Sequence, residues 1–273
     1  MDKDTSVALT FIRHGESTDN LLPIWAGWRD APLSEHGLAQ ATALGASLAS
    51  TRFDLILAST LKRAYTTAEL VLEAQSLPKS RIVTSPLLRE QTRGIAEGHP
   101  WLTETKPGMT LDEHYAQGLF PIHRERWQKF PGGESVDDLA RRAEEAVREV
   151  ILPHVLERLE RGTGNSHIAI ASHGLFIAEM IPVLLKMDVT SADSNTTFKG
   201  MKNTAWTRVV VNFQEVEGQQ SCKTLRARLS DLNRYEHLKD IAPENVVNTT
   251  DSVQTFSGDQ VNYDSSSRGD SRS

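Results

Sequence analysis

Short apolar runs alternate with longer amphipathic stretches along most of the chain. Each run ends in turn-forming or charged residues, and a short apolar run bounded in this way predicts a buried β-strand. The predicted strands lie at residues 7–12, 53–58, 81–84, 167–171 and 207–213, and residues 223–229 are expected to pair with the last of these.

Between the strands, apolar residues recur at the three- and four-residue spacing of an amphipathic helix. The first such stretch follows Ser34, a residue type that caps helix N-termini. The predicted helices lie at residues 35–48, 61–74, 135–161 and 175–186. Strands that alternate with helices favour an α/β fold, here a three-layer α/β/α arrangement with a mostly parallel central sheet.

Two stretches interrupt this alternation. Residues 92–134 are irregular and rich in aromatic residues and proline, so they are interpreted as an insertion that covers the sheet edge, with a helix near 111–119. From residue 240 onward apolar residues become rare and Ser, Asp, Asn and Thr dominate. Such a segment buries too little apolar surface to offset the entropy lost on ordering. The prediction is one domain over residues 1–239 and a disordered tail over 240–273.

The 273 residues carry a formal net charge of -6, and both acidic and basic residues contribute to it. This mildly acidic balance argues against general nucleic-acid binding. The lone cysteine, Cys222, can form no internal disulfide, so a reducing compartment, the cytoplasm, is expected. The N-terminal residues lack the pattern of a signal peptide, and no apolar stretch is long enough to span a membrane. We therefore expect neither nucleic acid nor membrane as partner, and the sequence leaves a homodimer open.

Charged residues follow four of the predicted strands. Arg13 and His14 follow the first strand, Arg63 lies soon after the second, Glu90 comes after the third, and His173 follows the fourth. Parallel strands end at one edge of their sheet, so these side chains are expected to converge in one pocket. Two arginines and two histidines around one point repel one another when charged, unless an anion or a carboxylate lies among them.

Phosphate matches such a cluster best, because arginine presents a planar fork of donors to its oxygens. Gly15 and Gly174 follow the two histidines and would let the backbone approach a ligand closely. The backbone amides that start a helix at these points would add further donors. The sequence alone therefore predicts a phosphate-binding pocket with a histidine at its centre.

Six segments, in order, resemble the histidine phosphatase superfamily, the phosphoglycerate-mutase-like proteins. An asparagine, Asn203, also stands where this family often has one. The matching segments are FIRHGESTDN (11–20), GWRDAPLSEHG (27–37), STLKRAYTTAE (59–69), LLREQTRGIAEG (87–98), PGGES (131–135) and SHG (172–174).

The resemblance implies a role for each matched residue. His14 would attack phosphorus and become phosphohistidine, and Glu90 would protonate the leaving oxygen and then deprotonate the attacking water. The residues implied to bind the phosphoryl group or line the substrate site are Arg13, Asn20, Gly27, Arg63, His173 and Gly174. No metal and no cofactor are implied, since arginines and histidines offset the phosphoryl charge.

Residues of the insertion are used here to choose between the mutases and the phosphatases of this family. A mutase would be expected to carry a pair of adjacent arginines there, which residues 92–130 lack. Where relatives often have an aromatic residue before a glycine, this chain has Arg93-Gly94. The favoured function is a metal-independent phosphomonoesterase acting on a small-molecule phosphate ester. The alternatives are a 2,3-bisphosphoglycerate-dependent phosphoglycerate mutase and a noncatalytic phospho-ligand binding protein.

Other residues near these motifs fit a structural role or a contact with substrate. Glu97 is expected to cap a turn or form a salt bridge. Trp25 and Trp28 flank Gly27 and fit either substrate contact or core packing. The aromatic residues of the insertion that are candidates to contact an apolar leaving group are Trp101, Tyr115, Phe120 and Trp127.

Overall fold

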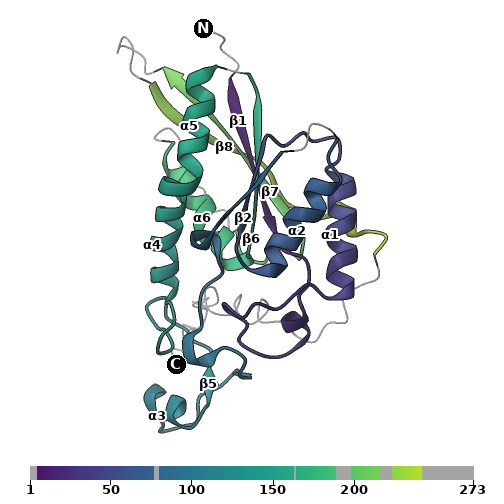
Figure 1. The fold of residues 1–273 in the computed structure, drawn as a ribbon. Coiled ribbons are helices and arrows are strands. Elements are labelled where there is room, and N and C mark those ends of the chain that lie inside the picture. The colour runs from purple at the N-terminus through teal and green to yellow at the C-terminus, as the bar shows by residue number, and fades with distance from the viewer. Residues whose placement is uncertain (1–4, 77–79, 163, 189–197, 216–222, 242–273) are drawn as a thin grey trace, which may run out of the picture.

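The computed structural model describes residues 5–76, 80–162, 164–188, 198–215 and 223–241. Its central sheet contains β1 (Ser6–Arg13), β2 (Leu55–Ser59), β3 (Ile82–Ser85), β6 (Ser166–Ser172), β7 (Trp206–Glu215) and β8 (Lys223–Arg234). The strand order is β3-β2-β6-β1-β7-β8 (Figure 1). The first four strands in this order are parallel, while β7 pairs antiparallel with β1 and β8 antiparallel with β7. The predicted mostly parallel sheet and the pairing of its last two strands are confirmed.

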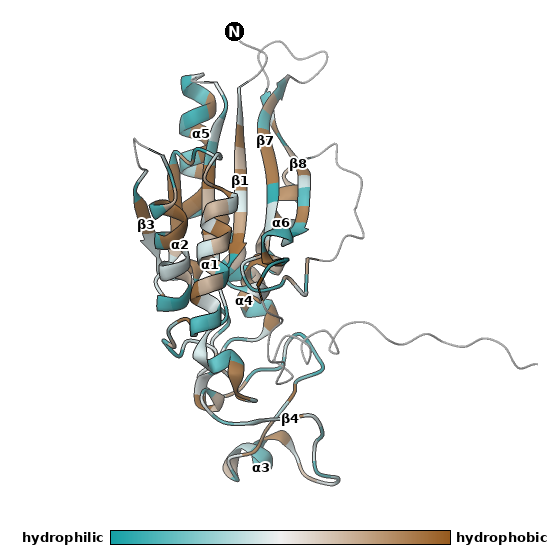
Figure 2. Ribbon diagram, turned by 90° about the vertical axis from the view of Figure 1, so that its right-hand side faces the viewer, coloured by the Kyte–Doolittle hydropathy of each residue, from teal (hydrophilic) through white to brown (hydrophobic). Residues whose placement is uncertain are grey.

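Helices cover both faces of the sheet. On one face lie α1 (Glu35–Ser47) and α2 (Lys62–Glu73), and on the other α4 (Val136–Ala146), α5 (Leu152–Arg161) and α6 (Gly174–Lys186). Alternate residues of β1 divide between them: Leu9 and Phe11 belong to the core under α4, α5 and α6, and Ile12 to the core under α1 and α2. Figure 2 shows the hydrophobic strands between these helices. The three-layer prediction is therefore confirmed.

The N-terminus of α1 is fixed against the loop that follows β1. Ser34 Oγ accepts a hydrogen bond from the amide of Gly37 at 2.9 Å, which makes Ser34 the predicted cap. The amide of Ser34 in turn donates to the carbonyl of Glu16 at 2.9 Å. A Cβ atom at Gly37 would stand 1.9 Å from that same Glu16 carbonyl oxygen. Only glycine allows the helix to approach the loop this closely.

The helix predicted over residues 135–161 has the expected extent but not the expected regularity. It begins after Ser135, whose Oγ accepts from the amide of Asp138 at 3.0 Å, and changes to a π-helical turn at Val147–Ile151 before α5. Pro153 lies in the first turn of α5. Proline has no N–H to give to the carbonyl four residues earlier, and a widened turn accommodates that loss. The apolar stripe still faces the core.

The insertion, residues 92–134, lies beyond the carboxyl ends of the parallel strands (Figure 1). It contains α3 (Leu111–Ala116) and the paired short strands β4 (Trp101–Leu102) and β5 (Phe120–Pro121). The predicted helix thus starts where expected and ends three residues earlier. A small apolar cluster holds the insertion together, in which Trp25 from an earlier loop packs with Ala96, Phe120 and Phe130.

The predicted tail lies, from residue 242 onward, outside the described residues, as does Cys222. Over the described ranges, no helix combines the length and hydropathy needed to cross a membrane.

Gly37→Ala should destabilise the protein, although the same change inside an ordinary helix stabilises it by about 1 kcal/mol. The added methyl meets backbone atoms of Glu16 that cannot rotate away, and overpacking of this kind costs about 1–3 kcal/mol. Thermal unfolding followed by circular dichroism should show a Tm lower by roughly 2–4 °C per kcal/mol. Thr42→Ala, at an exposed site of the same helix, should change the free energy of unfolding by at most about 0.5 kcal/mol. An unchanged or higher Tm for Gly37→Ala would contradict the packing argument.

Candidate active site

The carboxyl ends of the parallel strands surround a cavity of about 440 Å³, counting the space open to solvent. Six of the sequence-predicted residues lie on its wall, namely Arg13, His14, Asn20, Gly27, Arg63 and Glu90. The two other predicted residues lie beside it. The ring of His173 is 5.0 Å from the ring of His14, centroid to centroid, and Gly174 packs next to the Arg13 side chain. The structure therefore brings all the predicted site residues together.

The ring of His14 is held in one tautomer. Its Nδ1 lies 2.7 Å from the carbonyl oxygen of Gly15. A carbonyl oxygen only accepts hydrogen bonds, so Nδ1 carries the proton and donates it. The Nε2 atom consequently has a lone pair, toward which Arg63 Nε donates at 3.3 Å. Burial, followed by the charges of Arg63 and Arg13, holds the pKa of His14 well below the usual 6.5. A nucleophilic nitrogen is therefore available at neutral pH.

Arg63 is oriented by backbone carbonyls from the loop before α1. Its Nη1 donates to the carbonyl of Arg29 at 2.8 Å and its Nη2 to the carbonyl of Gly27 at 2.9 Å. Gly27 has a positive φ of 53°, and a Cβ there would stand 2.3 Å from Glu97 Oε1. The tight turn at Gly27 thus aims the carbonyl that fixes the guanidinium of Arg63 beside His14.

His173 is fully buried and bonded to the end of β2. Its Nε2 lies 2.9 Å from Ser59 Oγ, which itself accepts from the amide of Leu61 at 3.3 Å. The hydroxyl group of Ser59 thus links the ring of His173 to the turn that precedes α2. The Nδ1 atom of His173 is buried and has no hydrogen-bond partner in the described part of the chain. Burial, and next the charge of Arg63, hold the pKa of His173 well below 6.5.

Glu90 lies between the cavity and the N-terminus of α6. Its Oε2 accepts from the amide of Leu175 at 3.3 Å, and its Oε1 from the amide of Gln91 at 2.8 Å. Its backbone carbonyl accepts from Trp28 Nε1 and, at 2.9 Å, from Arg142 Nη2. The carboxyl group is therefore held at the cavity wall by hydrogen bonds to its oxygens and its main chain.

Glu97 has the capping role expected from the sequence, whereas the two tryptophans differ: Trp25 is buried and Trp28 is exposed. Glu97 Oε1 accepts from the amides of Trp28 and Arg93 and from Thr92 Oγ1, so it organises the loops beneath the cavity. Trp25 is 2 % exposed, belongs to the apolar cluster of the insertion, and also contributes to the cavity wall. Its indole Nε1 donates to the carbonyl of Phe120 at 3.0 Å.

The aromatic residues of the insertion do not line this cavity, contrary to the expected contact with a leaving group. Phe120 forms part of the insertion's apolar cluster, and Trp101 and Tyr115 pack against it. Trp127 is 68 % exposed. Large rings are needed here as a core, because the insertion lies away from the main sheet and must bury apolar surface of its own.

Among the described residues, no three His, Cys, Asp or Glu side chains gather as they would around a metal ion.

A model of the histidine phosphatase superfamily (branch 1) matches residues 9–224. The chain belongs to the histidine phosphatase superfamily. A 2,3-bisphosphoglycerate-dependent phosphoglycerate mutase of Methylobacterium radiotolerans is 32 % identical over 184 residues, 64 % of this chain and 78 % of that protein. A second protein of that name, from Gloeobacter violaceus, is 30 % identical over 68 % of this chain and 77 % of its own length.

A solved mycobacterial glucosyl-3-phosphoglycerate phosphatase has a TM-score of 0.59 to this chain at 26 % sequence identity. The match covers 84 % of this chain and 99 % of that one. Relatives of this histidine phosphatase chain are therefore named both as mutases and as phosphatases.

Part of the support behind His14 lies outside the six segments that match the superfamily. Asn203 Nδ2 and the amide of Thr204 donate to the carbonyl of His14 at 3.1 and 3.2 Å. Thr204 has a φ of 58°, a strained conformation for a β-branched residue. Its Oγ1 donates to the Asn203 carbonyl at 2.7 Å and lies 2.9 Å from Nε2 of His237, which therefore donates to it. A residue after β8 thus braces the loop that holds His14.

The lowered pKa of His14 predicts that its ring stays neutral at pH 6, where a histidine of pKa 6.5 is about three quarters protonated. Nitrogen-15 spectra of histidine-labelled protein, assigned by comparison with His14→Ala, would test this prediction. Phosphate must be absent, because a bound dianion would raise the pKa. A His14 ring that titrates near pH 6.5 would contradict the burial and the arginine charges given above.

His237→Ala should lower turnover several-fold with little change in KM, because it removes the donor that holds Thr204 in its strained conformation. His237→Gln supplies an amide donor and should retain more of the turnover. Steady-state kinetics with parallel Tm measurements would separate this effect from general unfolding, and Lys239→Ala, at an exposed site nearby, is the control. Equal losses in the alanine and glutamine variants would argue against the hydrogen bond.

Proposed function

We propose that the chain is a phosphomonoesterase that hydrolyses a small-molecule phosphate ester without a metal, through a phosphohistidine at His14. The observation that carries this proposal is the neutral Nε2 of His14 on the wall of a cavity shared with Arg13, Arg63 and Glu90. Nucleophile, anion-binding groups and a candidate proton donor are thus in one place. On the argument from its single cysteine, we assign the reaction to the cytoplasm.

In the first proposed step, the Nε2 lone pair attacks phosphorus and the ester P–O bond breaks. The leaving oxygen takes the proton of the Glu90 carboxyl group and departs as an alcohol. Arg13, Arg63 and His173 bind the phosphoryl oxygens and stabilise the charge that accumulates on them. The tautomer of His14 matters here, because a proton on Nε2 would leave no lone pair for the attack.

In the second proposed step, water attacks the phosphorus of phosphohistidine. Glu90, now a carboxylate, takes a proton from that water, and the P–N bond breaks to regenerate His14 with its lone pair on Nε2. The products are inorganic phosphate and a protonated Glu90 ready for the next ester. The sum of both steps is hydrolysis of the monoester.

A 2,3-bisphosphoglycerate-dependent phosphoglycerate mutase is the second candidate, and the names of the relatives favour it. Both activities start from the same phosphohistidine and differ in whether water or a second hydroxyl group receives the phosphoryl group. What supports hydrolysis is Arg93 in place of an aromatic residue and the lack of adjacent arginines in residues 92–130.

Phosphate release, measured with EDTA present over a panel of sugar phosphates, phosphoglycerates and nucleotides, should be lost in His14→Ala by more than about 10³-fold. Glu90→Gln should lower kcat by about 10²–10⁴-fold. Arg148→Met, an exposed arginine on the π-helical turn, is the control and should leave turnover unchanged. Turnover that survives in His14→Ala would overturn the proposed phosphohistidine.

Two other outcomes would decide between the alternatives. Isomerisation of 3-phosphoglycerate that depends on 2,3-bisphosphoglycerate and exceeds hydrolysis would identify the mutase. Binding of phosphate esters without turnover of any of them would identify a noncatalytic phospho-ligand binding protein.

A further inference from the structure

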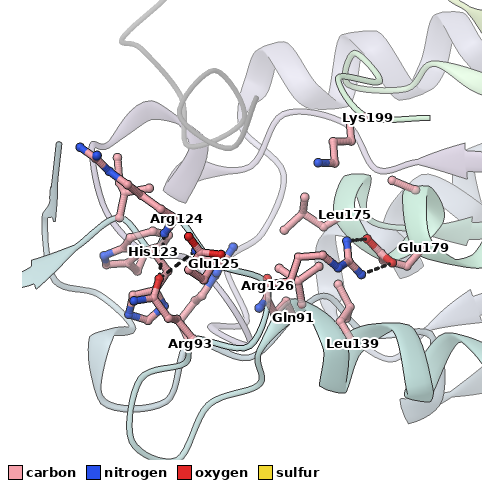
Figure 3. Close-up of a pocket in the computed structure, with 15 residues that line it drawn as sticks. Gln91, Arg93, His123, Arg124, Glu125, Arg126, Leu139, Leu175, Glu179 and Lys199 are labelled. Carbon is pink, nitrogen blue, oxygen red and sulfur yellow. Dashed lines mark hydrogen bonds and ion pairs between the residues drawn. The ribbon is translucent and has the colours of Figure 1, made fainter. Parts of the chain in front are cut away.

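Glu90, the proposed proton donor, stands between two hollow spaces. It lines the first cavity, while the next residue, Gln91, and its hydrogen-bond partner Leu175 line a second cavity of about 690 Å³, counting the space open to solvent (Figure 3). Arg93 and Trp25 line both cavities, which therefore adjoin. Because no side chains fill these two spaces, hydrogen bonds and not packing must keep the carboxyl group in place on those sides.

The segment that carries Glu90 lies outside the helices and strands of the fold. It follows a 3₁₀ turn at Pro86–Leu88, which itself follows β3, and it leads into the insertion. Main-chain carbonyl groups outside helices and strands need donors from elsewhere in the fold. The direction in which the Glu90 side chain points therefore depends on what binds the main chain of this segment.

The guanidinium of Arg142, which reaches the segment from α4, supplies these donors. Its Nη1 donates to the carbonyls of Leu87 at 2.9 Å and Arg89 at 2.7 Å, and its Nη2 donates to the carbonyl of Glu90 at 2.9 Å. The carbonyl of Glu90 also accepts from Trp28 Nε1. The side chain of Arg142 is 11 % exposed, so its hydrogen bonds form where little water competes for them. One rigid, planar group thus binds three carbonyl oxygens of residues 87–90.

Glu134 orients this guanidinium and offsets its charge. Its two carboxylate oxygens accept from Nε and Nη2 of Arg142 at 2.7 and 2.8 Å, which is a bidentate pair. Oε2 of Glu134 also accepts from the amide of Thr92 at 3.1 Å, and the carbonyl of Glu134 accepts from Gln91 Nε2 at 2.7 Å. The Arg142–Glu134 pair therefore holds the chain on both sides of Glu90.

Helix α6 contacts both the guanidinium and the carboxylate. The ring of Phe176, which is fully buried, lies with its centroid 4.6 Å from Cζ of Arg142. Stacking on an aromatic ring fixes the plane of a guanidinium. The preceding residue, Leu175, donates its amide to Oε2 of Glu90 at 3.3 Å, and Gln91 donates its amide to Oε1 at 2.8 Å. A shift of the main chain at Glu90 would break these two bonds and turn the carboxyl group away from its present direction.

We propose that Arg142 is a positioning residue for proton transfer, which fixes the main chain at Glu90 so that the carboxyl group points at the bridging oxygen of the ester. This inference rests on the proposed function, in which Glu90 protonates that oxygen. Arg142 is not among the described residues that line the first cavity. It therefore acts on the reaction through Glu90, and not by binding the phosphoryl group.

Two esters that differ in their leaving group test the inference. The anion of p-nitrophenol leaves without a proton, whereas the alkyl alcohol of a glycerol phosphate needs one. The value of kcat/KM covers only the steps up to loss of the leaving group, in which Glu90 acts as the acid. Arg142→Lys keeps the charge without the planar fork. It should lower kcat/KM about 10²-fold for glycerol phosphate and at most about threefold for p-nitrophenyl phosphate.

A double-mutant cycle shows through which residue Arg142 acts. Glu90→Gln removes the proton donor and should itself reduce kcat/KM far more for glycerol phosphate than for p-nitrophenyl phosphate. Glu90→Gln/Arg142→Lys should be at most about threefold slower than Glu90→Gln on glycerol phosphate, because the group that Arg142 positions is already lost. Additive losses would show that Arg142 supports the site as a whole, and would overturn the inference.

The effect of Arg142 on His173 is controlled by the same lysine variant. Burial, then the charges of Arg63 and His14, and after them the charge of Arg142 lower the pKa of His173. Because lysine keeps that charge, a changed protonation of His173 does not account for the expected loss.

Two further variants complete the design. Arg141→Met is the matched control, since Arg141 is the next residue on α4 and pairs with Asp138 at the surface, with a side chain 70 % exposed. It should leave kcat/KM unchanged for both esters. Arg142→Met/Glu134→Gln leaves no unpaired buried charge, so it serves if Arg142→Lys does not fold. It should show the same selective loss on glycerol phosphate.

Amide hydrogen exchange separates this inference from the proposed function. The amides of Gln91 and Leu175, which donate to the Glu90 carboxylate, should exchange at least about tenfold faster in Arg142→Lys. The amide of His14, which donates to the carbonyl of Ser172, should exchange at an unchanged rate. Faster exchange at the first two amides, in a protein that turns over no ester, would overturn the proposed function alone. Equal losses of kcat/KM for both esters, or unchanged exchange, would overturn the inference.

Discussion

The hydrogen bond from His14 Nδ1 to the carbonyl of Gly15 is the interaction on which the rest of the site depends. It is made between neighbouring residues at the end of β1, so it needs no distant partner to form. By holding the ring proton on Nδ1, it leaves Nε2 as the basic nitrogen that faces Arg63. The surrounding packing then serves to keep that nitrogen unprotonated, through burial and through the charges of two arginines.

The same electrostatics explain why the site suits an anion. Arg13 and Arg63 are 5 % and 3 % exposed, and the two histidines beside them have their pKa values lowered by burial first and by arginine charge next. Positive charge in a poorly solvated cavity is costly until an anion enters it. Neutral histidines limit that cost in the empty site, and a phosphoryl dianion would remove it. The arrangement thus favours binding of an anion over binding of a neutral molecule.

The sequence predicted those features that depend on neighbouring residues, namely the strands and the residues that follow them. Apolar runs located the strands, and the residues after them, such as His14 and His173, were found because every parallel strand ends at the same sheet edge. The support from Thr204 and His237 was not predicted, because it joins a loop and a segment after β8 that only the folded chain brings together. The π-helical turn was also not predicted, because the spacing of apolar residues continues through it unchanged. The aromatic residues of the insertion could be identified in the sequence. That they form a separate core, and not contacts with substrate, depends on tertiary packing.

The cluster around His14 and the wall formed by the insertion are held in place in different ways. The residues around His14 are anchored to strand ends by backbone hydrogen bonds, including that from the His14 amide to the carbonyl of Ser172 at 3.0 Å. The wall that carries Arg93 belongs to the insertion, which has a small core of its own and reaches α6 through the Arg126–Glu179 pair. A segment held by side-chain ion pairs needs less free energy to change its conformation than a strand within a sheet does. Substitutions in the insertion can therefore reshape that wall while the geometry at His14 is preserved.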